Sequence, residues 1–281
     1  ILLGKQNPSG KLATTWSAWE DYFPMEDFGD HNDTRYREGI YVGYRYFDSV
    51  AKKALFPFGY GLSYTTFAID GIAASAQGDQ ITVTATVTNT GARVGKEVVQ
   101  VYVSCPESKL DKPYQELAGF VKTSALVPGA SETVEVSFSM KDLASYDEED
   151  AAWILEKGNY VIRVGNSSVN TQIAALAMLG QTVTMLKAKN TCGKPDFIDW
   201  KPEREIPTVV DSTVPVLVLD GTDLPAEAVS YDRIYEVDEL VKGLSDEQLV
   251  YANIGEFSGS LSIIGEASKS VAGAAGESTS K

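Results

Sequence analysis

The middle of the chain alternates hydrophobic and polar residues with a period of two. Apolar side chains take every second position in four segments, at residues 81–87, 99–103, 134–140 and 160–164. This period is typical of β-strands with one buried face. Turn-forming sequences separate the segments, at residues 89–91, 128–129 and 157–159. The pattern predicts an antiparallel β-sandwich over residues 67–170, with added core volume from Leu117, Phe120, Leu126 and Trp153.

The chain before the predicted sandwich follows a different pattern. Residues 1–35 fit neither a helical nor a strand period. Two runs dense in glycine and aromatic residues follow, at 36–48 and 55–64. Glycine lets the backbone approach closely and aromatic rings fill the remaining space, so these runs predict packed, irregular structure. We therefore expect residues 1–66 to be the end of a larger domain.

The chain after the predicted sandwich loses the strand period. Residues 173–189 are compatible with a last strand or with a short helix. Residues 190–215 contain four prolines and many charges, which favours an extended connector. We expect residues 171–215 to link two domains and to be held against a neighbour by Phe197, Ile198 and Trp200.

Residues 216–281 are expected to begin a new unit. Val237, Leu240, Val241 and Leu244 have the spacing of an amphipathic helix. Ser245 and Gln248 have the form of a capping box, which predicts a second helix over about residues 245–254. Asp246 and Glu247 would then favour the first turn of that helix, and Gly255 would end it. Residues 258–281 are too rich in glycine and serine to form a core alone.

Length and charge narrow the possible partners. The 281 residues suit about two domains, and 43% of them are hydrophobic. The net charge of −15 disfavours nucleic acid as a partner, because an acidic surface repels phosphate. No apolar run approaches the roughly 20 residues that span a bilayer, so no membrane partner is expected. Both ends look like cuts in a longer sequence, no signal peptide is recognisable, and a cytoplasmic location is expected. The oligomeric state stays open.

Cysteine and histidine are too few for several kinds of site. Cys105 and Cys192 stand 87 positions apart without a CxxC pattern, which favours two free thiols over a disulfide. His31 is the single histidine, which excludes a multi-histidine metal site and disfavours a Ser-His-Asp triad. We therefore expect neither a metal nor a cofactor in this chain.

Several motifs resemble glycoside hydrolase family 3. Residues 7–12 (NPSGKL) resemble a motif near the end of the α/β sandwich domain of that family. Residues 36–48 (YREGIYVGYRYFD) and 55–64 (LFPFGYGLSY) resemble the run that leads into its fibronectin type III-like domain. Residues 98–103, 116–120, 126–129, 146–147 and 158–160 fit the pattern of that β-domain. The resemblance covers about residues 4–168.

The tail of the chain carries a shorter resemblance. Residues 240–249 resemble the opening helices of the (β/α)8-type barrel domain of the family, and residues 270–278 resemble a motif ahead of its first sugar-contacting strand. Ala272 stands where the family usually has proline. The resemblance implies a permuted domain order, in which the start of the barrel, residues 216–281, follows the β-domain.

The resemblance implies that the reacting groups lie outside this chain. Family 3 enzymes are retaining and use two carboxyl groups about 5 Å apart. The nucleophile belongs to an SDW-type motif that this chain lacks, and the acid/base belongs to an SEG-type motif upstream of the position of Ile1. The sugar-binding aspartate of the barrel would follow Lys281. We assign no catalytic, cofactor-binding or metal-binding residue in the chain.

Residues within the chain that resemble site residues have simpler interpretations. Glu38 and Asp48 bracket an aromatic run, but hydrogen bonding to the backbone or to Arg37 and Arg45 is favoured over a catalytic pair. For three tyrosines, packing against the β-domain is favoured over a sugar platform: Tyr41, Tyr44 and Tyr46. Three aspartates lack the spacing of a calcium loop and suit a solvated loop: Asp27, Asp30 and Asp33. The sequons at Asn32 and Asn166 carry no weight in a cytoplasmic protein.

Two functions of different classes remain. The first is a piece of a retaining β-glucosidase in which this chain scaffolds the joint between two catalytic domains, with a β-glucoside and the rest of the enzyme as partners. The second is a stand-alone carbohydrate-binding or adhesion module, which a β-sandwich alone also permits. The sequence leaves open whether the parent would act on glucosides, xylosides or N-acetylglucosaminides.

Overall fold

The computed structural model describes residues 1–23, 34–105, 109–203, 210–224, 227–228 and 236–249. The chain divides into two compact units, Ile1–Val229 and Ser230–Lys281, and each is described by itself.

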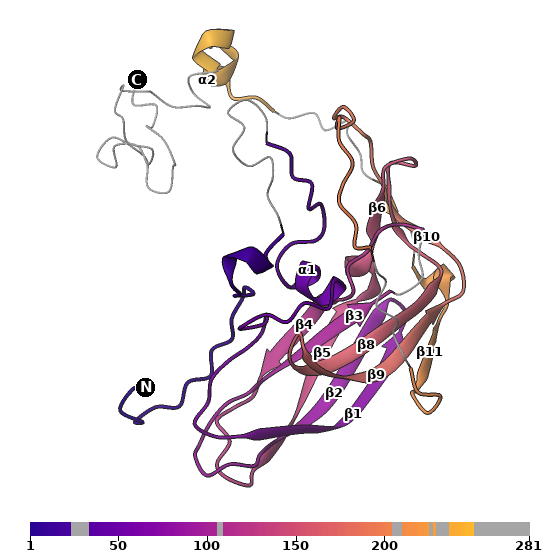
Figure 1. The fold of residues 1–281 in the computed structure, drawn as a ribbon. Helices are drawn as coiled ribbons and strands as arrows, with labels where there is room; N and C mark the ends of the chain where they lie inside the picture. Colours follow the sequence, from indigo (N-terminus) through magenta and orange to yellow (C-terminus); the bar gives the residue numbers. More distant parts are fainter. Residues whose placement is uncertain (24–33, 106–108, 204–209, 225–226, 229–235, 250–281) are drawn as a thin grey trace. The chain divides into compact units, whose positions relative to one another are not determined.

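A β-sandwich occupies the centre of the first unit (Figure 1). One sheet has the antiparallel order β1 (Phe67–Gln77), β2 (Gln80–Asn89) and β5 (Ser131–Ser139). The other has the order β11 (Val216–Leu219), β9 (Asn170–Leu179), β8 (Gly158–Ser167), β3 (Val98–Ser104) and β4 (Glu116–Lys122). The four alternating segments of the sequence lie in β2, β3, β5 and β8, which confirms the predicted strands and the mainly β fold.

The core lies between the two sheets, as the alternation requires. Every second residue of β2 faces inward and is buried, and the same holds for Val134, Val136 and Phe138 on β5. The opposing sheet contributes its own inward face: Val99, Val101, Val103, Ile162, Val164, Ala175, Ala177 and Leu179. Removing this apolar surface from water is the main term that stabilises the sandwich.

Three of the four residues expected in the core lie outside it. Leu126 belongs to the core, whereas Leu117 is partly buried without packing against it, and 67% of Phe120 and 42% of Trp153 are exposed. Phe120 lies on the edge strand β4 opposite Gln100, which points to the outer face of the sheet. Trp153 stacks on Tyr146 at the surface, with ring centroids 5.4 Å apart. Strand register, which the residue type does not reveal, decided both positions.

Strand pairing continues past residue 170, where the sequence pattern becomes irregular. β9 pairs antiparallel with β8, and β10 (Val183–Lys187) pairs antiparallel with β7 (Ala152–Leu155). β6 (Ser145–Asp147) and the short parallel strand β12 (Glu227–Ala228) complete a four-stranded sheet. β11 runs parallel to β9, so the range predicted to start a barrel domain begins with a strand of the sandwich. The 3-10 turns are η2 (Met140–Leu143) and η3 (Gly221–Asp223).

Residues before the sandwich lie over the outer face of the five-stranded sheet. They contain a 3-10 turn, η1 (Trp19–Asp21), and a short helix, α1 (Tyr44–Ser49). An isolated bridge pairs Trp16 with Phe56. Because this segment covers the sheet, every residue of β3 is buried, on both faces.

The second unit contains the helix α2 (Glu239–Lys242). The predicted capping box is confirmed. The backbone N–H of Gln248 donates to Ser245 Oγ at 3.3 Å, and the side-chain Oε1 of Gln248 accepts from the backbone N–H of Ser245 at 2.9 Å. Gly255 and the region 258–281 lie outside the described residues. Among the described helices, none has the length and apolar character required to cross a membrane.

Candidate functional site

The segment before the sandwich and the sandwich itself meet in a continuous joint. Asn7, in the motif at residues 7–12, fixes one end of it. Its Oδ1 accepts from the Tyr64 N–H at 2.8 Å, and its Nδ2 donates to the Val94 carbonyl at 3.1 Å. The carbonyl of Ser9 accepts from Lys122 Nζ at 2.9 Å. This motif thus attaches the beginning of the chain both to the entry of the sandwich and to its sheet.

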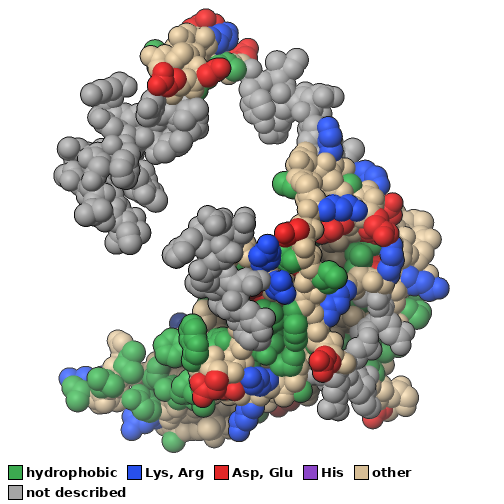
Figure 2. All heavy atoms as spheres, turned by 45° about the horizontal axis from the view of Figure 1, so that its top comes forward, with side chains coloured by type: hydrophobic (Ala, Val, Ile, Leu, Met, Phe, Trp, Pro, Cys, Tyr) green, Lys and Arg blue, Asp and Glu red, His purple; other side chains and the backbone are tan. Residues whose placement is uncertain are grey.

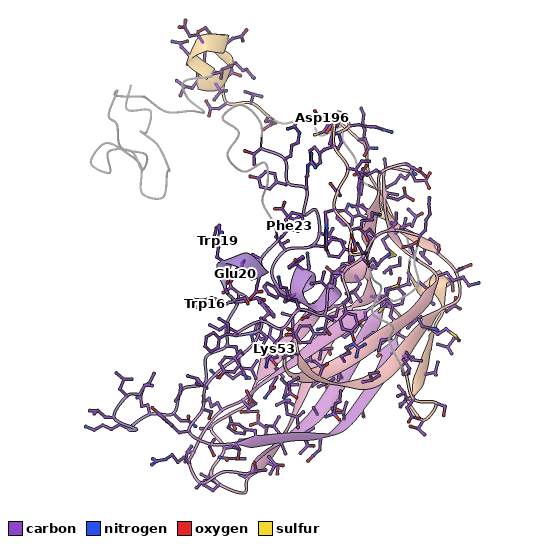
Figure 3. The ribbon with its side chains drawn as sticks, viewed as in Figure 1. Trp16, Trp19, Glu20, Phe23, Lys53 and Asp196 are labelled. Carbon is purple, nitrogen blue, oxygen red and sulfur yellow. The ribbon has the colours of Figure 1, made fainter. Side chains whose placement is uncertain are left out.

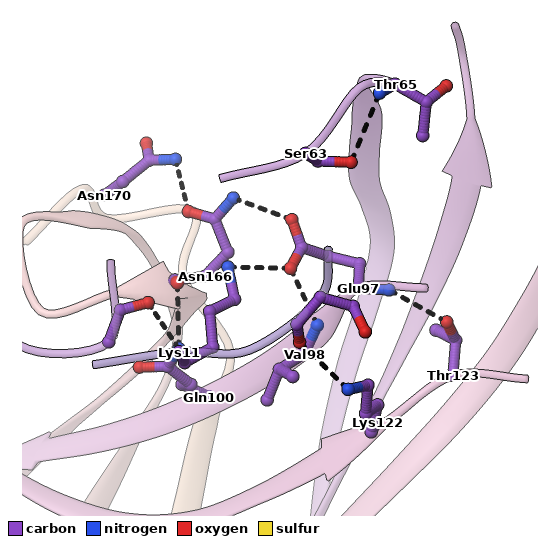
Figure 4. Close-up of polar contacts among 12 residues, drawn as sticks. Lys11, Ser63, Thr65, Glu97, Val98, Gln100, Lys122, Thr123, Asn166 and Asn170 are labelled. Atoms are coloured by element: carbon purple, nitrogen blue, oxygen red, sulfur yellow. Dashed lines mark hydrogen bonds and ion pairs between the residues drawn. The ribbon is translucent and has the colours of Figure 1, made fainter. Parts of the chain in front are cut away.

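An ion pair at the centre of the joint links Lys11 to Glu97, with 2.7 Å between Nζ and Oε1 (Figure 4). The Glu97 carboxylate also accepts from Asn166 Nδ2 at 3.2 Å and from the Val98 N–H at 2.7 Å. Both charged side chains are mostly buried. The added donors matter because a buried ion pair stabilises a fold only when its remaining polar atoms are satisfied.

Gln100 connects the outer face of β3 to the glycine-aromatic run at residues 55–64. Its Nε2 donates to the carbonyls of Gly59 at 3.2 Å and Asn166 at 2.8 Å. Its Oε1 accepts from Tyr102 Oη at 2.5 Å. All the polar atoms of this buried amide side chain are engaged, so Gln100 specifies how the run lies on the sheet.

The three tyrosines of the other glycine-aromatic run pack at the joint, as predicted. Tyr41 is buried, and its hydroxyl donates to Asp111 Oδ1 at 2.7 Å; burial, and then this carboxylate, raises the pKa of Tyr41. The Tyr44 ring stacks on Phe58 at 4.5 Å, and its hydroxyl accepts from the Leu117 N–H. Tyr46 contacts the ring of Phe47 edge-on at 5.5 Å. The three tyrosines therefore stabilise the interface between the preceding segment and the sandwich.

Glu38 and Asp48 do not form a pair. Glu38 lies in the turn at residues 37–40, whereas Asp48 lies on α1 and accepts from Gln115 Nε2 at 2.8 Å. Gln115 Nε2 also donates to the Ser168 carbonyl at 2.7 Å. Arg45 was predicted as a partner of these carboxylates, but it pairs with Glu116 at 2.8 Å instead. Neither carboxylate has the geometry of a catalytic dyad.

Asp48 gives the joint a testable pH dependence. Burial raises its pKa from 3.8 to about 6, although the Gln115 hydrogen bond acts in the opposite direction. The pKa of Asp48 is higher in the folded state than in the unfolded state. The contribution of Asp48 to the free energy of unfolding is therefore most favourable below pH 3.8, and it is lost as the pH rises through about 6. At pH 7.5 we expect Asp48→Asn to raise the free energy of unfolding by about 1 to 3 kcal/mol.

Denaturant unfolding of wild type and Asp48→Asn between pH 4 and 8 measures this effect. The gain should shrink toward pH 4, where the wild-type side chain is protonated. Asp70→Asn serves as the control, because Asp70 is exposed on β1. A variant that is equally destabilised at every pH would contradict the assignment, since it would show that the Gln115 contact requires a charged partner.

A second ion pair supports the loop that carries Asp111. Lys112 and Glu156 are in direct contact, with only 9% and 7% of their side chains exposed. Glu156 Oε1 also accepts from the Lys109 N–H at 2.7 Å. Burial alone would raise the pKa of Glu156, but the Lys112 ammonium and the backbone N–H groups outweigh it and leave the pKa below its usual value. The loop is therefore held in the position where Asp111 meets Tyr41.

Sequence patterns did not reveal the polar residues of the joint. Lys11 lies in a recognised motif, but its partner Glu97 precedes a strand by one residue and resembles any solvated acid. Gln100, Gln115 and Glu156 also lacked a spacing signal. One weak signal existed, because Gln100 and Tyr102 are uncharged at the supposedly solvated positions of β3.

A cavity of about 580 Å³ opens beside the joint. Its wall combines Tyr60, Lys11 and Lys53 with the loop that carries Asn166 and Asn170. Within the described residues, no three histidine, cysteine or acidic side chains come together as metal ligands. Cys105 and Cys192 are free thiols, as predicted. Three aspartates and one sequon of the sequence lie outside the described residues: Asp27, Asp30, Asp33 and Asn32.

Exposed apolar side chains gather on the segment before the sandwich. Figure 2 shows hydrophobic side chains concentrated there, at its left edge. Leu2 and Leu3 are almost fully exposed, and so is Trp19, which points away from the sandwich together with Trp16 (Figure 3). Exposed apolar side chains in such number suit an interaction surface.

Known proteins match this architecture. The family described as "Fibronectin type III-like domain" matches residues 97–168. Beta-glucosidase A of Butyrivibrio fibrisolvens is 45% identical over 197 residues, which cover 62% of this chain and 24% of the relative. An exo-alpha-(1->6)-L-arabinopyranosidase of Bifidobacterium longum is 40% identical, over 60% of this chain and 22% of its own length. The chain thus spans about a quarter of the length of these relatives.

Solved structures of β-glucosidases have the same fold over the matched part of the chain. Beta-glucosidase 3B of Thermotoga neapolitana, in complex with α-D-glucose, superposes with a TM-score of 0.62 at 41% identity, over 66% of this chain and 26% of that one. The GH3 beta-glucosidase of Bifidobacterium adolescentis gives a TM-score of 0.58 at 39% identity, with coverage of 66% and 27%.

The sandwich defines the class of protein: it is a mainly β protein built around a fibronectin type III-like domain. The matched part extends beyond that domain, at an identity far above what a shared fold alone would give. Over about two thirds of its length, the chain matches one segment of β-glucosidases, among them a GH3 enzyme, in both sequence and fold.

Proposed function

We propose that this chain is the scaffold segment of a retaining glycosidase that removes terminal β-D-glucosyl groups. The joint carries the proposal. Gln100 and the Lys11–Glu97 pair attach the preceding segment to the sandwich through buried, fully partnered polar groups. Such a network specifies one orientation, which a flexible domain linker would not do.

A rigid joint suits the chemistry of the family. A retaining enzyme holds its two carboxyl groups about 5 Å apart across the glycosidic bond. When the two groups come from different domains, a shift of about 1 Å between the domains can lower the rate roughly 100-fold. The role we assign to this chain is to resist that shift, while the nucleophile and the acid/base are supplied by parts of the enzyme outside it.

The flanking parts of the proposal follow from the same resemblance. Residues 1–66 would be the tail of an α/β sandwich domain, and the exposed side chains of Leu2, Leu3 and Trp19 suit positions that the rest of such a domain would cover. Residues 216–281 would include the start of a barrel domain. The arabinopyranosidase among the relatives shows that this architecture accepts more than one terminal sugar, so the glucoside is our choice of substrate from the more frequent relatives.

Activity assays test the proposal in two proteins. The purified 281-residue chain should give no turnover of an aryl β-glucoside above background, because both carboxylates lie outside it. A protein that extends the chain into the flanking domains should hydrolyse the same substrate with retention of configuration. Turnover by the 281-residue chain would contradict the scaffold role, and an extended protein that is inactive on β-glucosides would contradict the enzyme.

A carbohydrate-binding module is the second candidate, and the cavity beside the joint favours it. Tyr60 and Asn170 in its wall provide an aromatic face and an amide, which are groups that can contact sugars. Calorimetry of the 281-residue chain with glucose and cello-oligosaccharides discriminates the two roles. Saturable heat that is lost in Tyr60→Ala would support binding, and its absence leaves the scaffold role.

A further inference from the structure

The loop between β10 and β11, residues 188–215, begins and ends on the sandwich. At its start, the Ala188 N–H donates to the Ala151 carbonyl at 2.8 Å. At its end, the Pro215 carbonyl accepts from the Leu176 N–H at 2.9 Å, and β11 joins the sheet next to β9. The loop is much longer than the roughly 12–15 residues beyond which loops usually have a function or are disordered. It is therefore a strap with both ends attached, rather than a linker that leaves the domain.

The middle of this strap contacts the segment before the sandwich. The Trp200 ring lies 5.3 Å from Phe23, 5.2 Å from Tyr41 and 5.5 Å from Tyr46, measured between ring centroids. Figure 3 labels Phe23 in the segment before the sandwich and Asp196 on the strap. The Trp200 N–H donates to the Arg37 carbonyl at 2.6 Å. One residue of the strap thus enters an aromatic cluster and also bonds the backbone of the opposite segment.

Polar contacts flank this cluster on both sides. Arg35 pairs with Asp196 at 3.2 Å, and Lys201 lies 3.8 Å from Asp111. Asp111 in turn accepts from the Tyr41 hydroxyl. Asp111 belongs to the sandwich, Tyr41 to the preceding segment and Lys201 to the strap, so all three parts converge there.

The backbones also approach closely. A Cβ built on Gly39 would stand 3.0 Å from Asp199 Oδ2 and 3.5 Å from Asp199 Cβ. Gly39 has a φ of +50°, a conformation that favours glycine. The strap therefore lies directly on the turn at residues 37–40.

We propose that residues 188–203 of this strap form a clasp, anchored by Trp200, that holds residues 35–46 on the β-sandwich. The inference deepens the proposed scaffold function, on which it rests, by naming the element that keeps the preceding segment from pivoting. Strand β4 holds residues 35–46 through Leu117, whose N–H donates to Tyr44 Oη, and through Glu116, which pairs with Arg45, while Trp200 of the clasp contacts the rings of Tyr41 and Tyr46. A segment held on two sides loses the rotation that contact with one surface would still allow.

Amide hydrogen exchange of the 281-residue chain tests the clasp. In Trp200→Ala, exchange of residues 35–46 should rise at least 10-fold, while β2 and β3 keep their protection. Trp200→Phe should restore most of the protection, because it keeps an aromatic ring in the cluster. Trp19→Ala is the matched control, since 86% of that tryptophan is exposed and its side chain points away from the sandwich, so residues 35–46 should be unchanged. Unchanged exchange of residues 35–46 in Trp200→Ala would overturn the proposal.

A disulfide tests directly whether the strap lies on the turn at residues 37–40. Gly39→Cys and Asp199→Cys place two Cβ atoms about 3.5 Å apart, within the range of natural disulfides. In a Cys192→Ser background, mild oxidation should cross-link the two positions almost completely, as read by peptide mass spectrometry. A pair that stays reduced under conditions that oxidise a surface dithiol would overturn the clasp.

These outcomes are separate from the outcome for the proposed function. If the cross-link forms and the extended protein hydrolyses aryl β-glucosides equally well with and without it, both proposals stand. If the cross-link forms and the extended protein is inactive in either state, the clasp stands and the enzyme assignment fails. If the extended protein is active and the pair does not cross-link, the clasp fails alone.

Discussion

Replacing Gly59 with alanine is expected to lower the free energy of unfolding by about 2 to 4 kcal/mol. Gly59 has a φ of +78°, and a Cβ there would overlap the side-chain amide of Gln100. Gln100 would have to move, and its hydrogen bonds to Gly59, Asn166 and Tyr102 would be lost together. Because those bonds attach residues 55–64 to β3, the loss should appear first as faster amide exchange in that run.

Gly129→Ala provides a control matched in backbone conformation. Gly129 also has a φ of +78°, but nothing lies within 4 Å of a Cβ built there. Its substitution should cost about 1 kcal/mol, from backbone strain alone. Urea unfolding of the two variants separates backbone strain, which both share, from the overlap with Gln100, which only Gly59→Ala has. The difference between their free energies of unfolding measures that overlap. Equal destabilisation of both variants would show that the joint tolerates a displaced Gln100.

Replacing Lys112 with methionine is expected to lower the free energy of unfolding by about 3 to 5 kcal/mol, because it leaves a buried carboxylate without its partner. Glu156 would keep the hydrogen bond from the Lys109 N–H but lose the ammonium group. The folded-state pKa of Glu156 is below the unfolded value of 4.5 in the wild type. Its contribution is therefore present above pH 4.5 and lost as the pH falls through the lowered value, and Lys112→Met should weaken that dependence.

Two further variants make this result specific. The double variant Lys112→Met with Glu156→Gln should recover part of the stability, since no buried charge is left unpaired. Lys109→Met removes a mostly exposed lysine that pairs with Glu149 at 3.2 Å and with the buried Asp147 at 3.7 Å, and it should change stability much less than Lys112→Met does. A single Lys112 variant as stable as the Lys109 variant would contradict the assigned burial. Thermal and urea unfolding at pH 7 suffice for the comparison.

Features of the fold that depend on neighbouring residues in the sequence were predictable, whereas features that depend on strand order were not. The strands β2, β3, β5 and β8 followed from alternation, because the period of two is a direct consequence of strand geometry. The capping box at Ser245 was predictable for the same reason, since its two hydrogen bonds span three residues. Phe120 was misplaced because its position depends on which strand ends the sheet, which no local pattern encodes.

The strap at residues 188–215 shows where sequence reasoning is limited. Its prolines indicate extended backbone, and Trp200 suggested contact with a neighbour. Of the three residues expected to hold it, Trp200 does so through its ring contacts, whereas 87% of Ile198 is exposed. The identity of the neighbour could not be predicted, because Trp200 and Tyr41 are far apart in sequence and share no pattern.

By itself, the sequence determined a central β-sandwich, the family of its flanking motifs and the packing role of the tyrosines at residues 41–46. These depend on periodicity or on short motifs, in which the interacting positions are close together in the chain. Only the tertiary structure decided that both faces of β3 are buried, that Lys11 meets Glu97, and that Trp200 bonds the backbone of the segment before the sandwich. The physical reason is that these contacts arise where separate segments remove each other from water, and that depends on strand order and register rather than on local residue type.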